Sequence, residues 1–362
     1  MNWEDELSDR FLSNGHQLTM KELEEHRLQD RIKKSRRRID YRKKSFFWLG
    51  HKLELPHWLN LSEMLQRIDV EGSAYLYKEP QIIPKPEGGT RIILSPQADL
   101  KLVQTRINRL LLKTFPRRPE TFGYMGGSCL ELAQRHLGMA STLKFDIKDA
   151  FFQVPWTNVR KSVKGFRGIA PGFSGSVSHW IAKLCTYSPT PEHIRNQFGL
   201  WRGATSFLPQ GAPTSPICFH LACGPLDDEM TKLAKRFGGV WSRYADNYYF
   251  SMPTPQISNK LEEIVVCEAR TKGFKIHKVR RVKQGELCRI LGYNLLDGRI
   301  ANTRDFNRNF RGALYVLRTK LDRGLDYRDA YSRVKGFMGM AINVPENLRL
   351  EYDYCKNKIE TI

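Results

Sequence analysis

Two β-type segments, each carrying an aspartate among apolar residues, constrain the fold of this chain most. The first, STLKFDI (141–147), alternates strictly, so Thr142, Lys144 and Asp146 share one face and the apolar residues share the other. The second, VWSRYADNYYFSM (240–252), predicts two strands joined by a tight turn that Asp246 and Asn247 supply. If one sheet pairs these segments, Asp146 and Asp246 meet at one edge.

The elements predicted around these segments alternate between strands and helices. A strand pair is predicted over 75–96, and strands are predicted again in 275–296; helices are predicted in 97–115, after Lys148, and in 177–187, 217–237, 260–274 and from 303 onward. Because a strand, a helix, a strand pair, a helix and a strand follow one another, the pattern favours an α+β fold. In such a fold an antiparallel sheet is backed by helices.

The charge of the chain points to a polyanionic partner. Among 362 residues there are 59 Lys and Arg against 38 Asp and Glu, a formal net charge of +21. Solubility does not require so large an excess, so the composition predicts a nucleic-acid partner whose binding weakens steeply with salt. The densest basic run, RIKKSRRRIDYRKK, occupies 31–44.

Several classes of protein are disfavoured. The seven cysteines include no Cys-x-x-Cys pair, which favours reduced thiols over disulfides or a zinc site. No uncharged apolar stretch reaches about 18 residues, so we expect no membrane span. The first residues, MNWEDELSDRF, are acidic and lack an apolar signal core, so we expect a cytoplasmic protein.

The two aspartates predict a metal site. Paired carboxylates with no His or Cys near them suit hard divalent cations such as Mg²⁺, with Mn²⁺ as an alternative. Two such ions about 4 Å apart are a common device for phosphoryl transfer.

The motifs around these aspartates, taken in order, resemble those of reverse transcriptases. FDIKDAFFQV, LPQGAPTSP (208–216) and YADNYYF are similar to motifs A, B and C, and GGTRIILSP with LKLVQTRINRLLL is similar to the fingers motif of bacterial enzymes. GFKIHKVRR resembles motif D, and ILGYNL resembles the primer-gripping motif E. The resemblance covers roughly residues 75–320 and is greatest to retron-type and other defence-associated (unknown-group, Abi-like) enzymes.

The resemblance implies a role for each matching position. Asp146 and Asp246 would bind two catalytic Mg²⁺ ions, with the main-chain carbonyl of Ile147 as a further ligand. Phe151 would exclude a 2′-hydroxyl and so favour deoxynucleotides. The incoming nucleotide would be lined by Gln210 and Gly211 and its triphosphate held by Arg91, while the primer end would be cradled by Leu291, Gly292 and Tyr293.

The chain departs from the family pattern at several of these positions. Asn247 replaces the second aspartate of motif C, keeping one oxygen acceptor but losing a negative charge. The two essential aspartates survive, so we expect activity to be retained, and we expect Asn247→Asp to preserve or raise it. In motif D, Arg280 stands where the family has a lysine that protonates the leaving pyrophosphate. Arginine is a poor acid, so it can supply charge only, or Lys278 takes the place of that lysine.

Two elements that help retron enzymes hold their non-coding RNA are also incomplete. LAQRH keeps Ala133 and His136 of one, and ILG keeps only Gly292 of the other. This favours a defence-associated relative of retron enzymes over a retron enzyme proper.

The resemblance implies a right-hand polymerase with a ferredoxin-like palm. We expect a basic helical N-terminal extension (1–74), fingers (75–140), a palm (141–300) with a fingers insertion at about 157–207, and a helical thumb (301–362). The expected activity is DNA synthesis from deoxynucleotides on a dedicated structured RNA, in anti-phage defence. An effector protein or a second polymerase subunit is a further possible partner. Two alternatives are a polymerase that makes DNA without a template or as simple repeats, and a catalytically silent RNA-binding scaffold.

Overall fold

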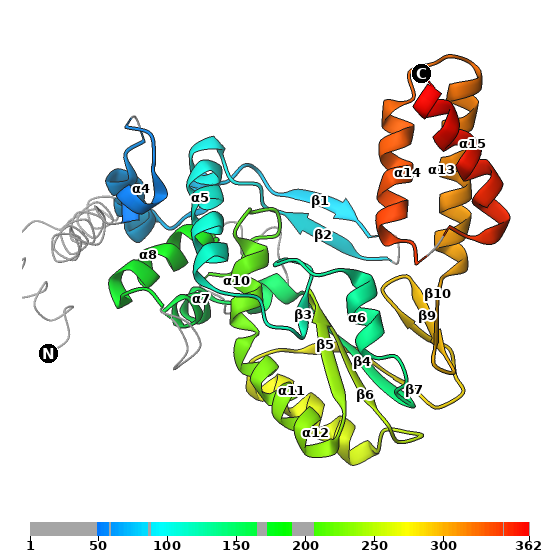
Figure 1. Cartoon of the computed structure of the whole chain (residues 1–362). Helices are drawn as coiled ribbons and strands as arrows, with labels where there is room; N and C mark the ends of the chain where they lie inside the picture. Colours follow the sequence, from blue (N-terminus) through cyan, green and yellow to red (C-terminus); the bar gives the residue numbers. More distant parts are fainter. Residues whose placement is uncertain are drawn as a thin grey trace, which may run out of the picture. The chain divides into compact units, whose positions relative to one another are not determined.

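The computed structural model describes residues 49–57, 59–85, 88–164, 172–189, 206–342 and 344–361. The chain forms two compact units, one of Met1–Thr114 with Val154–Cys218 and the other of Phe115–Gln153 with Phe219–Ile362 (Figure 1). The expected four-part division stays a prediction, and the basic run at 31–44 lies outside the described residues.

The first unit combines a hairpin with helices. Strands β1 (Gln81–Pro84) and β2 (Thr90–Ile93) pair antiparallel, as predicted for 75–96. Its helices are α4 (Leu61–Glu71), the 3-10 turn η1 (Ala74–Leu76), α5 (Ala98–Thr114), α7 (Trp156–Val163), α8 (Gly175–Cys185) and the first half of α10 (Ser215–Ala222). Helix α5 buries Leu100, Val103, Ile107 and Leu111, which confirms the predicted apolar spacing there.

The second unit is built on a five-stranded sheet in the order β3-β5-β6-β4-β7. The strands are β3 (Thr121–Phe122), β4 (Ser141–Ile147), β5 (Val240–Tyr244), β6 (Asn247–Met252) and β7 (Ile276–Val282). Strand β4 pairs antiparallel with both β6 and β7, and Asp146 lies opposite Asn247. The predicted pairing of the two aspartate-bearing segments is therefore confirmed, and so is the α+β class.

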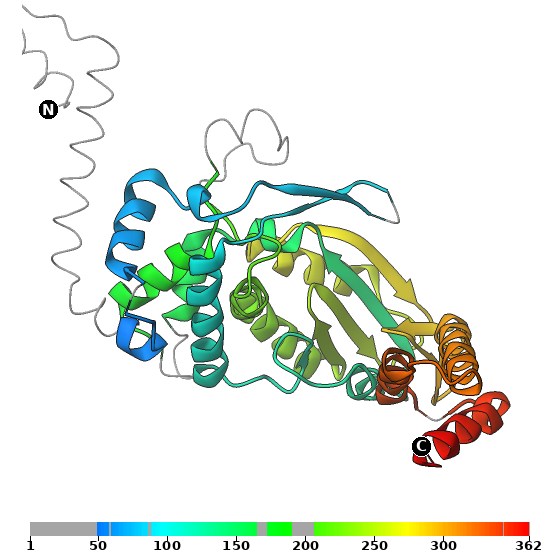
Figure 2. The same cartoon turned by 90° about the horizontal axis from the view of Figure 1, so that it is seen from above.

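The two faces of this sheet are covered by different helices. Tyr248 points to one face, where its hydroxyl bonds Asp227 of α11 (Gly224–Phe237), and α12 (Asn259–Thr271) packs beside α11. Tyr249 points to the other face and contacts His136, which follows α6 (Cys129–Arg135). Figure 2 shows the strands of the sheet side by side, seen from above. At the Asp146 end the second face is partly exposed.

Two predicted helices are wrong in detail. The helix expected over 217–237 is divided into α10 and α11 at Cys223, because Pro225 at the start of α11 has no N–H for a continuous helix. After Lys148 the chain first forms a short 3-10 helix, η2 (Ala150–Gln153), preceded by Asp149 at a positive φ of 44°, and the α-helix α7 begins only at Trp156.

A second small sheet and three helices complete this unit. Strands β8 (Cys288–Ile290), β9 (Tyr293–Leu296) and β10 (Arg299–Asn302) form an antiparallel meander. Helices α13 (Arg304–Asp322), α14 (Arg328–Met340) and α15 (Glu346–Thr361) share a core of their own (Figure 1). In the part of the chain that the structure describes, no helix is long and apolar enough to cross a bilayer.

Candidate active site

A tight two-residue turn between β5 and β6 carries Asp246. Tyr244 pairs with Asn247, so the turn consists of Ala245 and Asp246. The predicted Asp-Asn turn is thus wrong by one residue, because Asn247 already belongs to the ladder of β6. Ala245 has a φ of 56°, which costs a side-chain-bearing residue energy and persists only where the surroundings hold it.

A buried ion pair holds that turn. Arg243 is fully buried and donates from Nη1 to the Ala245 carbonyl at 3.1 Å. Its Nε and Nη2 donate to the two oxygens of Asp227 at 2.9 and 2.7 Å, and the Tyr248 hydroxyl donates to the same carboxylate at 2.9 Å. Burial, the largest single influence, would lower the pKa of Arg243, but the charges of Asp227, Cys223 and Tyr248 and the hydrogen bond to Asp227 together outweigh it, so the pKa lies well above its usual value.

The ends of β4 and of the β5–β6 turn bring Asp146 and Asp246 to one edge. Asp146 is opposite Asn247, and the amide of Ile147 donates to the main-chain oxygen of Asp246 at 3.1 Å. The Asn247 side chain donates from Nδ2 to Asp246 Oδ1 at 3.1 Å. A carboxylate at position 247 could not make that contact without a proton or a cation between the oxygens.

A histidine side chain also lies at this edge of the sheet. His277 Nδ1 lies 3.3 Å from Asp146 Oδ2, although we expected no His near the aspartates. The register between β4 and β7 shifts between Phe145 and Ile147, and this irregularity brings β7 beside Asp146. The segment that resembles motif D therefore contributes His277 to the edge that carries the aspartates.

The donor set at this edge suits a hard cation. Mg²⁺ in enzymes is held through one or two carboxylates together with substrate phosphates. Asp146 and Asp246 supply such carboxylates, and carboxylate oxygens also suit Mn²⁺. The described residues contain no group of three or more His, Cys, Asp or Glu side chains placed to hold a metal by themselves.

Phe151 lies among aromatic rings in the same unit. Its ring is 5.6 Å from Phe219 and 6.2 Å from Tyr124, and it is half-buried. Burial, and next the negative charge of Asp246, raises the pKa of Tyr124 to about 12. Tyr124 therefore belongs to the surroundings of Asp246, although FGYMGG gave no signal for it. Phe152 is also only half-buried, so neither phenylalanine is a plain core residue.

The other predicted nucleotide-binding residues lie in the first unit. Arg91 is exposed on β2, opposite Ile83. The Gln210 carbonyl accepts from the Leu94 amide at 2.7 Å. Gly211 has a φ of +120°, and a Cβ there would meet Ile93 at 3.0 Å and the Leu94 carbonyl at 3.1 Å. The LPQGAPTSP loop thus packs tightly against the end of β2, and only glycine fits at 211.

The predicted primer-gripping residues form the turn between β8 and β9. Leu291 and Gly292 have φ values of 47° and 90°, and Ile290 pairs with Tyr293, which together define a two-residue hairpin turn. The Tyr293 side chain is buried and its hydroxyl donates to the Met340 carbonyl at 2.5 Å. The structure thus places Tyr293 in the core and leaves Leu291 half-buried in the turn.

The two motif D cations differ in position. Arg280 pairs with Lys144, two residues before Asp146 on β4, whereas Lys278 is close in sequence to His277. Arg280 is therefore level with Lys144 on β4 and not with Asp146.

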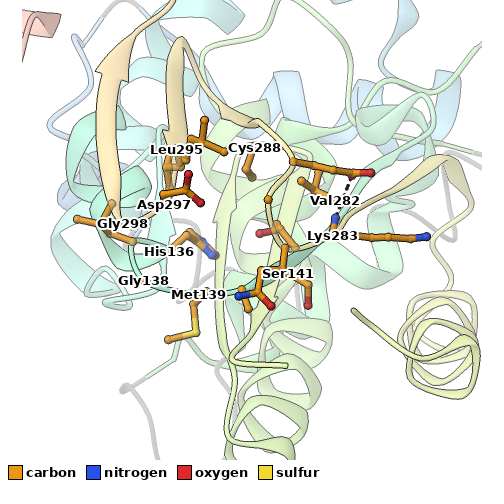
Figure 3. A pocket seen from close by; sticks show the side chains of 17 residues that line it. His136, Gly138, Met139, Ser141, Val282, Lys283, Cys288, Leu295, Asp297 and Gly298 are labelled. Atoms are coloured by element: carbon orange, nitrogen blue, oxygen red, sulfur yellow. Dashed lines mark hydrogen bonds between the residues drawn. The ribbon is translucent and has the colours of Figure 1, made fainter. Parts of the chain in front are cut away.

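His136 of the incomplete retron element lines a cavity of about 200 Å³ (Figure 3). Its Nδ1 lies 2.7 Å from Ser251 Oγ, and its Nε2 is buried with no hydrogen-bond partner among the described residues. Burial, and then the charges of Arg135 and Lys144, lower its pKa to about 3, so the ring is neutral.

Several known proteins are similar to this chain in sequence. Two retron reverse transcriptases of Myxococcus xanthus are similar to this chain: Mx162 (31% identical, covering 58% of this chain and 45% of that protein) and Mx65 (29%, covering 58% and 49%). The chain thus spans about half the length of these relatives. Retron Ec86 reverse transcriptase of Escherichia coli is 27% identical over 64% of this chain and 69% of its own.

Solved structures also match. Apo telomerase from Candida tropicalis aligns with 77% of this chain and 59% of its own at 12% identity and a TM-score of 0.47. The model of one family, reverse transcriptase (RNA-dependent DNA polymerase), matches residues 83–295, which include Asp146, the LPQGAPTSP loop and Asp246. This chain therefore belongs to the reverse transcriptase family.

Proposed function

We propose that this chain is an RNA-directed DNA polymerase. The observation that carries the proposal is the meeting of Asp146 and Asp246 at one sheet edge through the β4–β6 register, within a chain of this family. A formal charge of +21 supports a nucleic-acid partner.

In the proposed reaction a primer 3′-hydroxyl attacks the α-phosphorus of a deoxynucleoside triphosphate, and pyrophosphate leaves. Asp146, Asp246 and the Ile147 carbonyl would hold Mg²⁺, which when bound activates the attacking oxygen and stabilises the leaving one. The side chain of Asn247 keeps Asp246 oriented through its Nδ2 donor. Lys278 is the candidate for neutralising or protonating the departing pyrophosphate, since lysine can release a proton and arginine cannot.

Further residues of the motifs would select the substrate. Phe151, half-buried against Tyr124 and Phe219, is the proposed barrier to a 2′-hydroxyl. Gln210 and Gly211 would line the incoming nucleotide and Arg91 would bind its phosphates, for which a guanidinium fork is well suited. The Leu291–Gly292 turn is proposed to contact the primer strand.

The retron relatives suggest the biological setting. We propose that a dedicated structured RNA is the template, that DNA is the product, and that the protein acts in anti-phage defence. An effector protein or a second polymerase subunit would be a further partner. The partly retained LAQRH element, with His136 beside its cavity, favours a related but different RNA.

The proposal is tested with protein purified together with its bound nucleic acid. Mg²⁺ and labelled deoxynucleotides are added to the wild type and to Asp246→Ala, and all products are sequenced. We expect DNA complementary to a co-purified RNA from the wild type and none from Asp246→Ala. A simple repeat or a random sequence would point to untemplated synthesis. RNA bound equally to both proteins, with no DNA from either, would point to a silent scaffold.

A further inference from the structure

A cavity with three cationic side chains lies between the edge of the five-stranded sheet and β8. Its volume is about 280 Å³ and it is lined by Lys144, Arg280, Leu287 and Arg289. All four residues belong to the second unit. None of the roles described above uses Lys144 or Arg289.

The sheet places this cavity on the face that carries the catalytic aspartate. Lys144 and Asp146 are two residues apart on β4, so both side chains point to the same face about 6.6 Å apart along the strand. Arg280 lies directly opposite Lys144 on β7 and shares that face. Arg289 comes from β8, two residues before the Leu291–Gly292 turn.

The three cations lack a counter-charge. Lys144 Nζ donates to the main-chain oxygen of Arg289, and no carboxylate of the described residues forms an ion pair with Lys144, Arg280 or Arg289. Arg281, on the opposite face of β7, differs: it is ion-paired with Glu262 and hydrogen-bonded to Asn259. An anion entering the cavity would offset the repulsion among these three positive side chains.

We propose that Lys144, Arg280 and Arg289 bind a backbone phosphate of the strand whose 3′ end lies at Asp146, which is the primer strand. The inference rests on the proposed function, because that function puts the 3′ end there. Two guanidinium forks and an ammonium suit a phosphodiester. Arg280 thereby acts on the primer backbone, not on the leaving group.

The first measurement is the salt dependence of primer–template binding by the full chain. Arg289→Gln removes a side-chain charge from the cavity and keeps the main-chain oxygen that Lys144 uses. Arg299→Gln, on the exposed strand β10 of the same small sheet, is the matched control because it lowers the net charge equally. We expect Arg289→Gln to bind about tenfold more weakly and to reduce the magnitude of the log–log salt slope by about 1. The control should keep the wild-type slope.

The second measurement identifies the phosphate. Primers carrying one neutral methylphosphonate, moved through the last four linkages, are bound to the wild type and to Arg289→Gln. We expect a methylphosphonate at one of the last three linkages to weaken primer binding by the wild type about tenfold. The same methylphosphonate should hardly change binding by Arg289→Gln, because both changes remove the same contact. Additive effects at every linkage would overturn the proposal. A third outcome is that pyrophosphate inhibits primer binding by Arg289→Gln less than by the wild type, while no linkage shows coupling to Arg289. That result would mean that the site binds a free phosphate, and it would also overturn the proposal.

Binding and synthesis are scored separately. A wild type that binds primer–template with linkage-specific coupling but incorporates no nucleotide would refute the proposed function and leave the site supported. A wild type that incorporates nucleotides with no coupling would refute the site alone. A wild type that binds no primer–template would refute both. Thermal unfolding of both variants is measured alongside, and matching midpoints show that folding is intact.

Discussion

Removing the Asp227 carboxylate should destabilise the second unit more than any exposed ion pair could. In Asp227→Ala the fully buried Arg243 guanidinium loses acceptors at 2.9 and 2.7 Å, and the Tyr248 hydroxyl loses its acceptor at 2.9 Å. Breaking a buried pair by deleting one partner costs about 3–5 kcal/mol, since a buried charge is left uncompensated. For a unit of this size the midpoint of thermal unfolding should fall by about 6–20 °C.

The next residue along α11 supplies the control. Asp228 pairs with Arg118 at 2.6 Å, but their side chains are 34% and 22% exposed. Asp228→Ala should therefore cost at most about 1 kcal/mol. Calorimetry and urea unfolding measure both variants. An Asp227→Ala loss no larger than that of Asp228→Ala would refute the reasoning.

A double variant separates stability from site geometry. Asp227→Leu with Arg243→Met removes both charges, and apolar replacement of a buried pair is often neutral or stabilising, so part of the lost stability should return. Activity should not return, because the Ala245 carbonyl still lacks the donor that holds the turn bearing Asp246. Primer extension at a temperature where both proteins are folded tests this. Recovery of the wild-type rate would mean that Arg243 does not position Asp246.

Three further changes test the site. Asn247→Asp should preserve or raise DNA synthesis at saturating Mg²⁺. In EDTA it should lower the midpoint of thermal unfolding, because two carboxylates then face each other where Nδ2 of Asn247 now donates to Asp246. A large loss of synthesis would instead mean that the amide has a specific role. Phe151→Val should raise ribonucleotide incorporation relative to deoxynucleotide incorporation by about tenfold or more, measured by single-nucleotide extension, and an unchanged ratio would remove Phe151 from sugar selection. Gly211→Ala should lower the free energy of unfolding by about 1–3 kcal/mol. The new Cβ would lie 3.1 Å from the Leu94 carbonyl oxygen, and the backbone at 211 has a φ of +120°. Unchanged stability would contradict the tight packing of the loop.

The parts of this structure that follow from local periodicity could be predicted from the sequence. The alternation in 141–147 correctly sets Leu143, Phe145 and Ile147 on the apolar face, and the spacing in 97–115 correctly gives the buried side of α5. The pairing of the Asp146 strand with the hairpin was also predicted, because both β-type segments carry an aspartate among apolar residues.

What depends on register and on distant partners could not be predicted. The turn lies at Ala245–Asp246 because the buried Arg243 side chain bonds the Ala245 carbonyl and so supports a positive φ at Ala245, which alanine by itself disfavours. His277 reaches Asp146 through a strand irregularity that no local pattern indicates. Lys144 was recognised only as a residue on the polar face of its strand. Its cavity is formed by Arg280 and Arg289, which lie far along the chain.

Strand β7 also affects the tendency of this protein to aggregate through its sheet edge. Among the residues that the structure describes, it is the outermost strand of the five-stranded sheet and pairs with β4 alone, so its other edge presents main-chain groups that another chain could join. Most of its residues are exposed, and His277, Lys278, Arg280 and Arg281 follow one another closely along it. Charged edges, lysine-bearing ones above all, discourage edge-to-edge aggregation. The same basic strand that faces the proposed primer would then also protect the free enzyme from self-association before nucleic acid binds.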